Sequence, residues 1–468
     1  MNRQILVLLA GLVLLLSACS FAPKYVRPTA PIPAAWPQGS AYKEATTSAA
    51  VMVQNLSWRE FFVDSQLQKM IDLALESNRD LRLAVLNVER ARAMYGIQRA
   101  ELYPVVNAVG AGGKQRRSAD LISPGDPRTV EQYGVNLGIA AWEIDFFGRI
   151  RNLKDQALEA YLATDEARRG AQITLVAEVA RTYLTLGADQ ENYRLAQETL
   201  ATQQQAYELI HKSYVVGVAT QLDLRRAQMP VDIARGDVAR YAQRVAQDKN
   251  ALILLAGGTI SEGLLPTDLS SITLLREISA GLPSELLLLR PDILAVEHQL
   301  KGAYAFIGAA RSAFFPRISL TTTIGTASAE LSGLFSSGTG TWNFSPQIAM
   351  PIFDARTWAA YRVSKADQKI ALTRYEKSIQ TAFREVADAL AVQGTVDQQV
   401  AAQQSLTEAV AETYRLSNKR YTGGIDSYLS VLDAQRSLYG AQQGLITLRL
   451  AKLINQVQFY AVLGGGAF

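Results

Sequence analysis

The chain carries one helix–turn–helix segment twice, 207 positions apart. Residues 212–228 read KSYVVGVATQLDLRRAQ, and residues 419–435 read KRYTGGIDSYLSVLDAQ. Lys, Tyr, Gly, Leu and a closing Ala-Gln pair occupy the same places in both segments. Further matches on either side extend the repeat over most of the chain after residue 58. A repeat of this extent predicts that one structural unit is built twice within the 468 residues.

The hydrophobic periodicity changes in the same order within each copy. In each copy, apolar residues at helical spacing end at a proline. Apolar and small or polar residues then alternate with period two, and a long helical run without proline comes next. We expect repeat 1 over 58–256, a linker over 257–287 and repeat 2 over 288–468. Each repeat should hold two strands, a long helix and a returning helix. The expected bounds are 103–113, 133–147, 149–213 and 221–256 in repeat 1, and 316–326, 342–353, 357–420 and 428–463 in repeat 2.

The N-terminus, MNRQILVLLAGLVLLLSACS, carries an export and lipidation signal. Arg3 precedes a twelve-residue apolar core, Ile5–Leu16, which is too short to span a bilayer comfortably. Leu16-Ser17-Ala18-Cys19 matches the bacterial lipobox, so we expect residues 1–18 to be removed and Cys19 to receive N-palmitoyl and S-diacylglycerol groups. An ordinary signal peptide with an incidental cysteine is the alternative, although Cys19 is the only cysteine in the chain.

The residues that follow Cys19 favour the outer membrane. Ser20 stands where an Asp would usually retain a lipoprotein at the inner membrane. Residues 19–57 begin with FAPKYVRPTAPIPAAWPQGS after the cysteine and serine, and this proline-rich composition predicts an extended arm. Because no second cysteine exists, the mature chain has no disulfide or free-thiol chemistry.

The strand segments have one apolar and one polar face. In the second copy Ile318, Leu320 and Ile324 alternate with serine, threonine and glycine. Strands of about ten residues with this pattern fit the wall of a transmembrane β-barrel, although a half-buried soluble sheet alternates in the same way. Aromatic residues at strand ends, such as Tyr133 and Trp342, favour the membrane. Lipid tolerates no open sheet edge, and four strands are too few to close, so other subunits must supply the rest.

The long helices predict an extended assembly. At 1.5 Å per residue each would span about 95 Å. Their narrow apolar stripe suits helices packed side by side in a wall with one flank facing water. Such helices next to a barrel indicate a conduit, and a rod-like tether between envelope layers is the alternative.

Several function classes have no support in the sequence. The net charge is only +4, and no basic recognition motif indicates nucleic acid. The two histidines, His211 and His298, fall at non-equivalent places in the repeat, and we expect surface roles for both. No metal-ligand cluster, phosphate loop or catalytic triad is present in the sequence. We therefore expect neither an enzyme nor a resident cofactor apart from the lipid.

Taken together, the lipobox, the proline-rich arm, the two strand–helix repeats and the stretch GIDSYLSVLDAQRSLYGAQQ resemble the bacterial outer-membrane efflux proteins. The resemblance is to the TolC-like family and especially to its lipidated OprM-like branch. It implies a mixed, mainly α fold in a homotrimer, with four strands per chain and twelve in the barrel. A long α-helical periplasmic barrel would continue from it, with a small α/β equatorial region. The implied partners are outer-membrane lipid, a periplasmic adaptor and an inner-membrane transporter of the resistance–nodulation–division class.

The repeated segments would then be the periplasmic tips, where Gly217 and Gly424 suit the turns. By resemblance, Leu429 forms an apolar constriction and Asp433 a ring of carboxylates one helical turn on. The first copy departs from this pattern, because Arg226 stands where Asp433 does. Ordinary capping and surface charges are the alternative. The remaining gate candidates are Tyr421, Asp426, Tyr428 and Arg436, which could hold the tips together, and Leu222 and Asp223 in the first tip.

The function implied by the resemblance is a passive exit duct that exports drugs and other small toxic compounds across the outer membrane. A duct for type I protein secretion or for metal ions has the same architecture. The lipobox weighs against the first of these, and the six methionines weigh weakly against copper or silver. A structural tether would have no pore.

Overall fold

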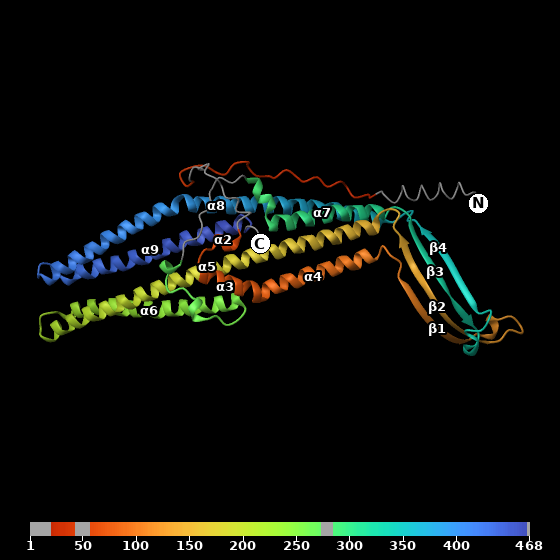
Figure 1. Cartoon of the computed structure of the whole chain (residues 1–468), viewed down its shortest axis with the longest axis horizontal. Coiled ribbons are helices and arrows are strands. Elements are labelled where there is room, and N and C mark those ends of the chain that lie inside the picture. Colours follow the sequence, from red (N-terminus) through yellow and green to blue (C-terminus); the bar gives the residue numbers. More distant parts are fainter. Residues whose placement is uncertain (1–19, 43–56, 273–283, 466–468) are drawn as a thin grey trace. The chain divides into compact units, whose positions relative to one another are not determined.

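The repeat of the sequence reappears as a repeat of elements. The computed structural model describes residues 20–42, 57–272 and 284–465, so Cys19 and the expected signal peptide lie outside the described residues. In each copy a helix precedes two strands, a long helix and a returning helix (Figure 1). The first copy comprises α4 (Arg79–Ala100), β1 (Val106–Arg116), β2 (Thr129–Ile144), α5 (Arg149–Val215) and α6 (Gln221–Ala256). The second comprises α7 (Pro291–Ser312), β3 (Arg317–Ser328), β4 (Gly340–Ala349), α8 (Ala355–Thr422) and α9 (Tyr428–Val462).

The bounds of these strands and helices differ from the expected ones by no more than about four residues. α6 continues as helix through Pro230. The linker contains short turns. Its described residues form 3₁₀ turns at Glu262–Leu264, Leu269–Ser271 and Ser284–Leu289, and none of them belongs to a strand.

The four strands form one antiparallel sheet in the order β1-β2-β3-β4. The register between copies pairs Val135 with Thr326, and an irregularity between Ile139 and Trp142 interrupts it. Within the described chain, β1 and β4 each pair on one side only. The sheet therefore has two edges whose backbone groups lack a strand partner in the same chain.

The apolar side chains of the sheet are exposed. On β4, Trp342 is 79% exposed, Phe344 61% and Ile348 69%. A soluble sheet would bury its apolar face against a second layer, because leaving such side chains in water forfeits the hydrophobic driving force. The exposure therefore disfavours the soluble-sheet alternative.

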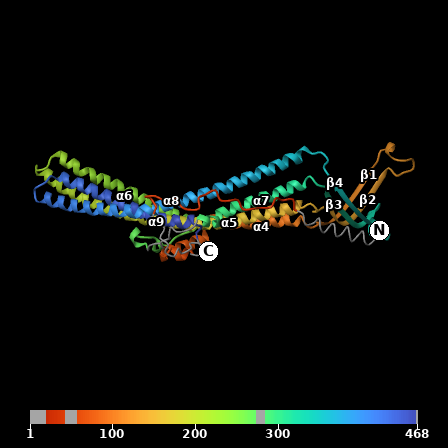
Figure 2. The same cartoon turned by 90° about the horizontal axis from the view of Figure 1, so that it is seen from above.

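The chain divides into two compact units. The strand unit contains 20–29, 87–165 and 295–375, and the helical unit contains the other described residues. In the helical unit, α5 and α6 form one hairpin and α8 and α9 form the other (Figure 2). No helix among the described residues has an apolar stretch long enough to cross a bilayer.

An aromatic cluster anchors the helical unit. Two short helices, α2 (Trp58–Phe61) and α3 (Ser65–Ser77), begin with side-chain caps from Ser57 and Asp64. They bring Phe61 and Phe62 against Tyr460 near the end of α9, with ring centroids 4.7 Å and 5.4 Å apart. All three rings are fully buried, and burying aromatic surface is the dominant favourable contribution here. This cluster fixes the base of the hairpins whose far ends are the candidate site.

Candidate functional site

Both hairpin tips are closed by the same backbone motif. Gly217 has φ 80° and Gly424 has φ 73°, which places both in the left-handed region that favours glycine. Around Gly424, the Ile425 N–H donates to the Arg420 carbonyl at 2.9 Å, and the Gly424 N–H donates to the Tyr421 carbonyl at 3.0 Å. The equivalent bonds close the turn at Gly217. This pair of bonds is the Schellman motif, which satisfies the last carbonyls of a helix.

The first returning helix begins with a capping box. The Thr220 N–H donates to Asp223 Oδ2 at 3.0 Å, and the Asp223 N–H donates to Thr220 Oγ1 at 3.2 Å. The hydrogen bond from the Thr220 hydroxyl holds the pKa of Asp223 below its ordinary value. Asp223 therefore caps α6, which is the local alternative that the sequence left open. Leu222 beside it is exposed in the single chain.

The second tip has an internal ion pair that the first tip lacks. Arg420 donates from Nε and Nη2 to the two carboxylate oxygens of Asp426, at 2.6 Å and 3.1 Å. This pair lowers the pKa of Asp426. The repeat places Ser213 and Ala219 at the matching positions, so the first tip has no such pair. The two arms of the second tip are thus tied together by charge.

Two tyrosines reinforce the second tip. The rings of Tyr421 and Tyr428 lie 5.1 Å apart, and burial raises the pKa of Tyr428 to about 12. Both residues belong to the same tip as Asp426. The described contacts of Tyr421, Asp426 and Tyr428 with one another and with Arg420 lie within the second tip, and their role in holding the tips together stays a prediction.

The expected gate residues lie on one face at the start of α9. Leu429 and Asp433 are one helical turn apart and therefore point the same way. Arg436 donates from Nη2 to Asp433 Oδ1 at 3.0 Å, three residues along the same helix. Within the single chain, Arg436 thus balances the Asp433 charge. Leu429 and Asp433 are about half exposed in the single chain.

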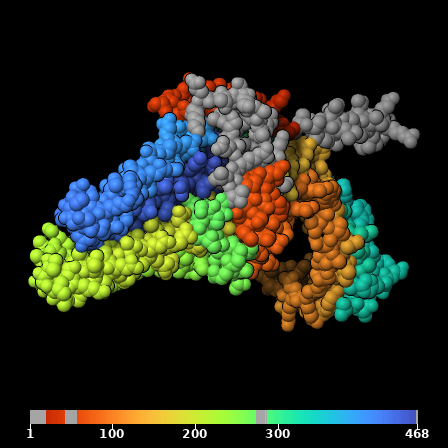
Figure 3. Space-filling view, turned by 60° about the vertical axis from the view of Figure 1, so that its left-hand side comes forward, coloured from red at the N-terminus to blue at the C-terminus, as the bar shows by residue number. Residues whose placement is uncertain are grey.

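The two copies are joined further along α9 by polar contacts that the sequence reasoning missed. The Tyr439 hydroxyl donates to Asp237 Oδ2 at 3.0 Å, and Gln443 Nε2 donates to the Tyr241 hydroxyl at 3.0 Å. Burial and the Asp237 carboxylate both raise the pKa of Tyr439, so this hydroxyl remains a donor at neutral pH. Figure 3 shows the blue hairpin of α8 and α9 lying against the yellow-green hairpin of α5 and α6.

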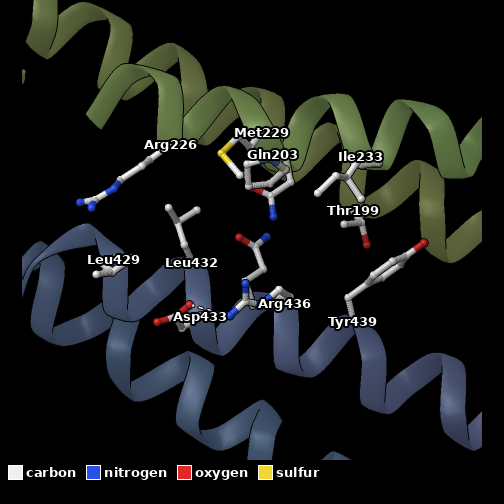
Figure 4. Close-up of a pocket in the computed structure, with 13 residues that line it drawn as sticks. Thr199, Gln203, Arg226, Met229, Ile233, Leu429, Leu432, Asp433, Arg436 and Tyr439 are labelled. Carbon is white, nitrogen blue, oxygen red and sulfur yellow. Dashed lines mark hydrogen bonds and ion pairs between the residues drawn. The ribbon is translucent and has the colours of Figure 1, made fainter. Parts of the chain in front are cut away.

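A cavity of about 190 Å³ lies between these helices, next to Leu429 and Asp433, the expected gate residues (Figure 4). Its walls come from α5, α6 and α9, so both copies of the repeat contribute. It brings Arg226 of the first copy to the same space as Leu429 and Asp433 of the second. The lining residues are Thr199, Gln203, Arg226, Met229, Pro230, Ile233, Ala234, Leu429, Leu432, Asp433, Gln435, Arg436 and Tyr439.

A carboxyl pair lies between α5 and α6 in the same unit. Asp189 and Asp248 interact through a side-chain hydrogen bond, and Arg244 Nη1 lies 3.8 Å from Asp189 Oδ1. Burial and the neighbouring Asp189 charge raise the pKa of Asp248 to about 6, against the opposing charge of Arg244. Asn455 of the second copy is equivalent to Asp248 of the first, so the repeated unit accommodates an amide side chain at this position.

This pair predicts a pH dependence of stability. The folded protein binds the Asp248 proton more tightly than the unfolded chain does. The stabilisation that protonated Asp248 gives to the folded state is therefore complete below about pH 4 and is lost as pH rises through about 6. We expect Asp248→Asn to raise stability at pH 7 by about 1 kcal/mol, a value reduced for solvent screening, and to leave it unchanged at pH 4. Thermal unfolding midpoints at both pH values measure this.

The control for that measurement is Asp232→Asn, which removes an exposed carboxylate from the same helix. It should change the free energy of unfolding by less than about 0.5 kcal/mol at either pH. Midpoints of Asp248→Asn that run parallel to those of the wild type from pH 4 to 7 would contradict a shared proton.

The geometry defines a class of envelope protein. An antiparallel sheet with exposed apolar side chains and two open edges is suited to lipid, and two long helical hairpins with glycine-closed tips are suited to water. Comparison with known proteins places the chain within this class. The family model described as outer membrane efflux protein matches residues 70–258 and 282–465.

Individual relatives agree over nearly the whole length. The toluene efflux pump outer membrane protein TtgC and the antibiotic efflux pump outer membrane protein ArpC, both of Pseudomonas putida, are each 48% identical to this chain. The match covers 98% of this chain and 95% of theirs. The open state of the Neisseria gonorrhoeae MtrE outer membrane channel has a TM-score of 0.85 at 37% identity, over 96% of this chain and 98% of that one. The chain belongs to the outer membrane efflux protein family and is an outer-membrane component of an efflux system.

Proposed function

We propose that this chain is the outer-membrane exit duct of a tripartite efflux system and works as a passive channel without catalytic activity. The observation that carries the proposal is the sheet with exposed Trp342, Phe344 and Ile348 and with open edges at β1 and β4. Lipid covers such apolar side chains, and only further strands satisfy the open edges inside a membrane.

Three copies of the chain would close the sheet. One chain supplies four strands, and a homotrimer pools twelve into a barrel. The same symmetry brings six hairpin tips together, three of them carrying Leu429 and Asp433. A periplasmic adaptor and an inner-membrane transporter of the resistance–nodulation–division class would deliver the cargo to these tips. Native mass spectrometry of the detergent-extracted protein measures the number of chains.

A lipid on Cys19 fits the surroundings of the next two residues. The Ser20 hydroxyl donates to Asn152 Oδ1 at 2.8 Å, near the start of α5. The Phe21 ring stacks on Phe315, with centroids 4.5 Å apart, just before β3. Ser20 and Phe21 thus lie where strands give way to helices, and acyl chains attached to the preceding residue in the sequence would enter the membrane beside the sheet. The mass of the mature N-terminal peptide identifies these acyl groups.

The proposed cargo is small apolar compounds, including drugs. The names of TtgC and ArpC refer to toluene and to antibiotics. Both relatives match 98% of this chain, so the same class of compound is the best-supported cargo here. Drug susceptibility of a deletion strain measures it.

The channel function predicts a measurable pore with a gate at the second tip. We expect the wild type to conduct ions in a planar lipid bilayer, and Leu429→Ala with Asp433→Ala to raise conductance at least about twofold, because an apolar constriction and a charged ring are both removed. Leu222→Ala, in the first tip, is the matched control and should change conductance less.

The two possible failures have different meanings. If none of these proteins conducts, the chain is a tether or scaffold and not a channel. If the wild type conducts and the double variant conducts equally, the channel stands but Leu429 and Asp433 are not its gate.

A further inference from the structure

A cationic and aromatic surface lies where the sheet is followed by α8. We propose that it binds the phosphate headgroup of an anionic phospholipid such as phosphatidylglycerol. This headgroup surface consists of Arg311 and Phe314 at the end of α7 and of Trp358, Tyr361 and Lys365 near the start of α8, all within the strand unit. The inference rests on the proposed function only in requiring that the sheet lies in lipid.

The aromatic side chains of the headgroup surface hold one another in place. Trp358, Tyr361 and Lys365 are three and four residues apart, a spacing that places them on the same side of a helix. From α7, the Phe314 ring lies edge-on to Trp358 and to Tyr361, with centroids 4.8 Å and 6.0 Å apart. Trp358 is nevertheless 60% exposed. The rings are therefore fixed by contacts within the chain and remain open to an external partner.

Two cations lie beside the same tyrosine ring. Arg311 Cζ is 5.9 Å and Lys365 Nζ 5.6 Å from the ring centroid of Tyr361. Arg311 Nη1 donates to the Phe21 carbonyl at 3.0 Å, but this neutral acceptor leaves the guanidinium charge uncompensated. Within the described residues, neither cation has a carboxylate at ion-pair distance. A hydrogen bond from Arg311 and the charges of Arg311 and Lys365 lower the pKa of Tyr361, so the surroundings are positive and favour an anion.

The order of residues along the chain matches the layers of a membrane. After β4, Ile352 and Phe353 are each 90% exposed, as expected of side chains that contact hydrocarbon. Trp358 and Tyr361 come next, and these residue types favour the interface. Lys365 is last, and because helical side chains tilt towards the N-terminus, it extends back towards the sheet. This order favours a lipid headgroup as the anion, because a soluble phosphate needs no apolar neighbours.

The test measures which lipid the protein prefers. The full-length protein is extracted in detergent, freed of non-covalent lipid and titrated with phosphatidylglycerol or with phosphatidylcholine of the same acyl chains. Native mass spectrometry measures the bound lipid. We expect the wild type to bind phosphatidylglycerol about thirtyfold more tightly, because each of two cations contributes about fivefold near a lipid surface. Lys365→Gln should reduce this preference about fivefold, and Arg311→Gln with Lys365→Gln should abolish it.

Two control variants test whether the position of the charge matters. Arg374→Gln removes a cation from the opposite side of α8, nine residues beyond Lys365, and should keep the preference. Lys365→Arg retains the charge and should also keep it. Binding of phosphatidylcholine should be the same in every variant, which shows that each one is folded. Because no current is measured, a lost preference leaves the channel function standing, and a protein that does not conduct can still show the preference.

Three outcomes would overturn the inference. Equal binding of the two lipids by the wild type would mean that the headgroup surface does not select charge. A loss of preference in Arg374→Gln as large as in Lys365→Gln would mean that net charge alone attracts the lipid. Displacement of phosphatidylglycerol by inorganic phosphate, beyond the effect of sodium chloride at equal ionic strength, would mean that the surface takes soluble phosphate and not lipid.

Discussion

Replacing Gly257 with alanine should destabilise the protein by about 3 kcal/mol or more, while the same change at Gly258 should have little effect. Gly257 ends α6 with φ 73°, a conformation that costs an L-residue about 1–2 kcal/mol. A Cβ at this position would lie 2.2 Å from the backbone carbonyl oxygen of Ser77. Neither group is a flexible side chain, so the backbone of α3 or α6 would have to move.

The surroundings of Gly257 explain why such a shift is expensive. Asn78 donates from Nδ2 to the Leu255 carbonyl at 2.9 Å, and its Oδ1 accepts from the Leu81 N–H at 2.9 Å. One buried side chain therefore both caps α4 and ties the end of α3 to the end of α6. Separating α3 from α6 would break the bond to Leu255 and leave polar groups unsatisfied, which adds to the steric cost.

The measurement is the thermal unfolding midpoint of the detergent-extracted protein, followed by tryptophan fluorescence. An added Cβ at Gly258 would meet no atom of the described residues within 4 Å, and Gly258 has no positive φ, so Gly258→Ala is the matched control. We expect it to be neutral or to stabilise by about 0.5 kcal/mol through the unfolded chain. Equal midpoints for the two variants would contradict the close approach of α3 to Gly257.

The sequence predicts the order and bounds of the elements well because their periods differ sharply. Apolar and polar residues alternate with period two in a strand and not in a helix. Pro104 and Pro316 mark the change from helix to strand in the two copies. The turns at Gly217 and Gly424 are readable for a similar reason, since a left-handed residue after a long helix favours glycine. These features depend on the conformations of residues that are neighbours in the sequence, so the sequence alone predicts them.

Contacts between distant residues leave no such local signal. The hydrogen bond from Tyr439 to Asp237 joins positions 202 residues apart, and nothing in either helix requires the other. The same holds for Gln203, whose burial depends on three helices packing together. Asp223 is different: Thr220 and Asp223 stand at capping-box spacing, so its local role was readable. The resemblance implies a gate role for Asp223, and the observed hydrogen bonds with Thr220 give it a role as the cap of α6.

The second large effect is expected where the N-terminal arm meets α7. Glu297 is only 2% exposed and receives the Tyr25 hydroxyl at 3.0 Å and Arg27 Nε at 3.2 Å, with Lys301 Nζ 3.3 Å away. Burial would raise the pKa of Glu297, but the hydrogen bond from Arg27 and the charge of Lys301 outweigh it and hold the pKa below its ordinary value. The carboxylate is therefore charged at neutral pH and depends on the arm for its partners.

Removing one partner of a buried charge is costly, because the remaining charge stays away from water. Arg27→Ala should weaken the attachment of the arm by about 2 kcal/mol, below the usual range for a buried pair, because Arg27 is half exposed and Tyr25 and Lys301 remain. If arm opening is fast compared with cleavage, this loss corresponds to about thirtyfold faster digestion by chymotrypsin after Tyr25.

Two variants separate the ion pair from a general loosening of the arm. Arg27→Lys keeps the charge but cannot donate to both carboxylate oxygens, so its digestion rate should fall between those of the wild type and Arg27→Ala. Lys24→Ala removes a cation from the same arm that has no contact with Glu297 in the described structure, and its rate should match the wild type. The order of rates is the diagnostic result. Lys24→Ala digested as fast as Arg27→Ala would mean that net charge, and not the buried carboxylate, holds the arm on α7.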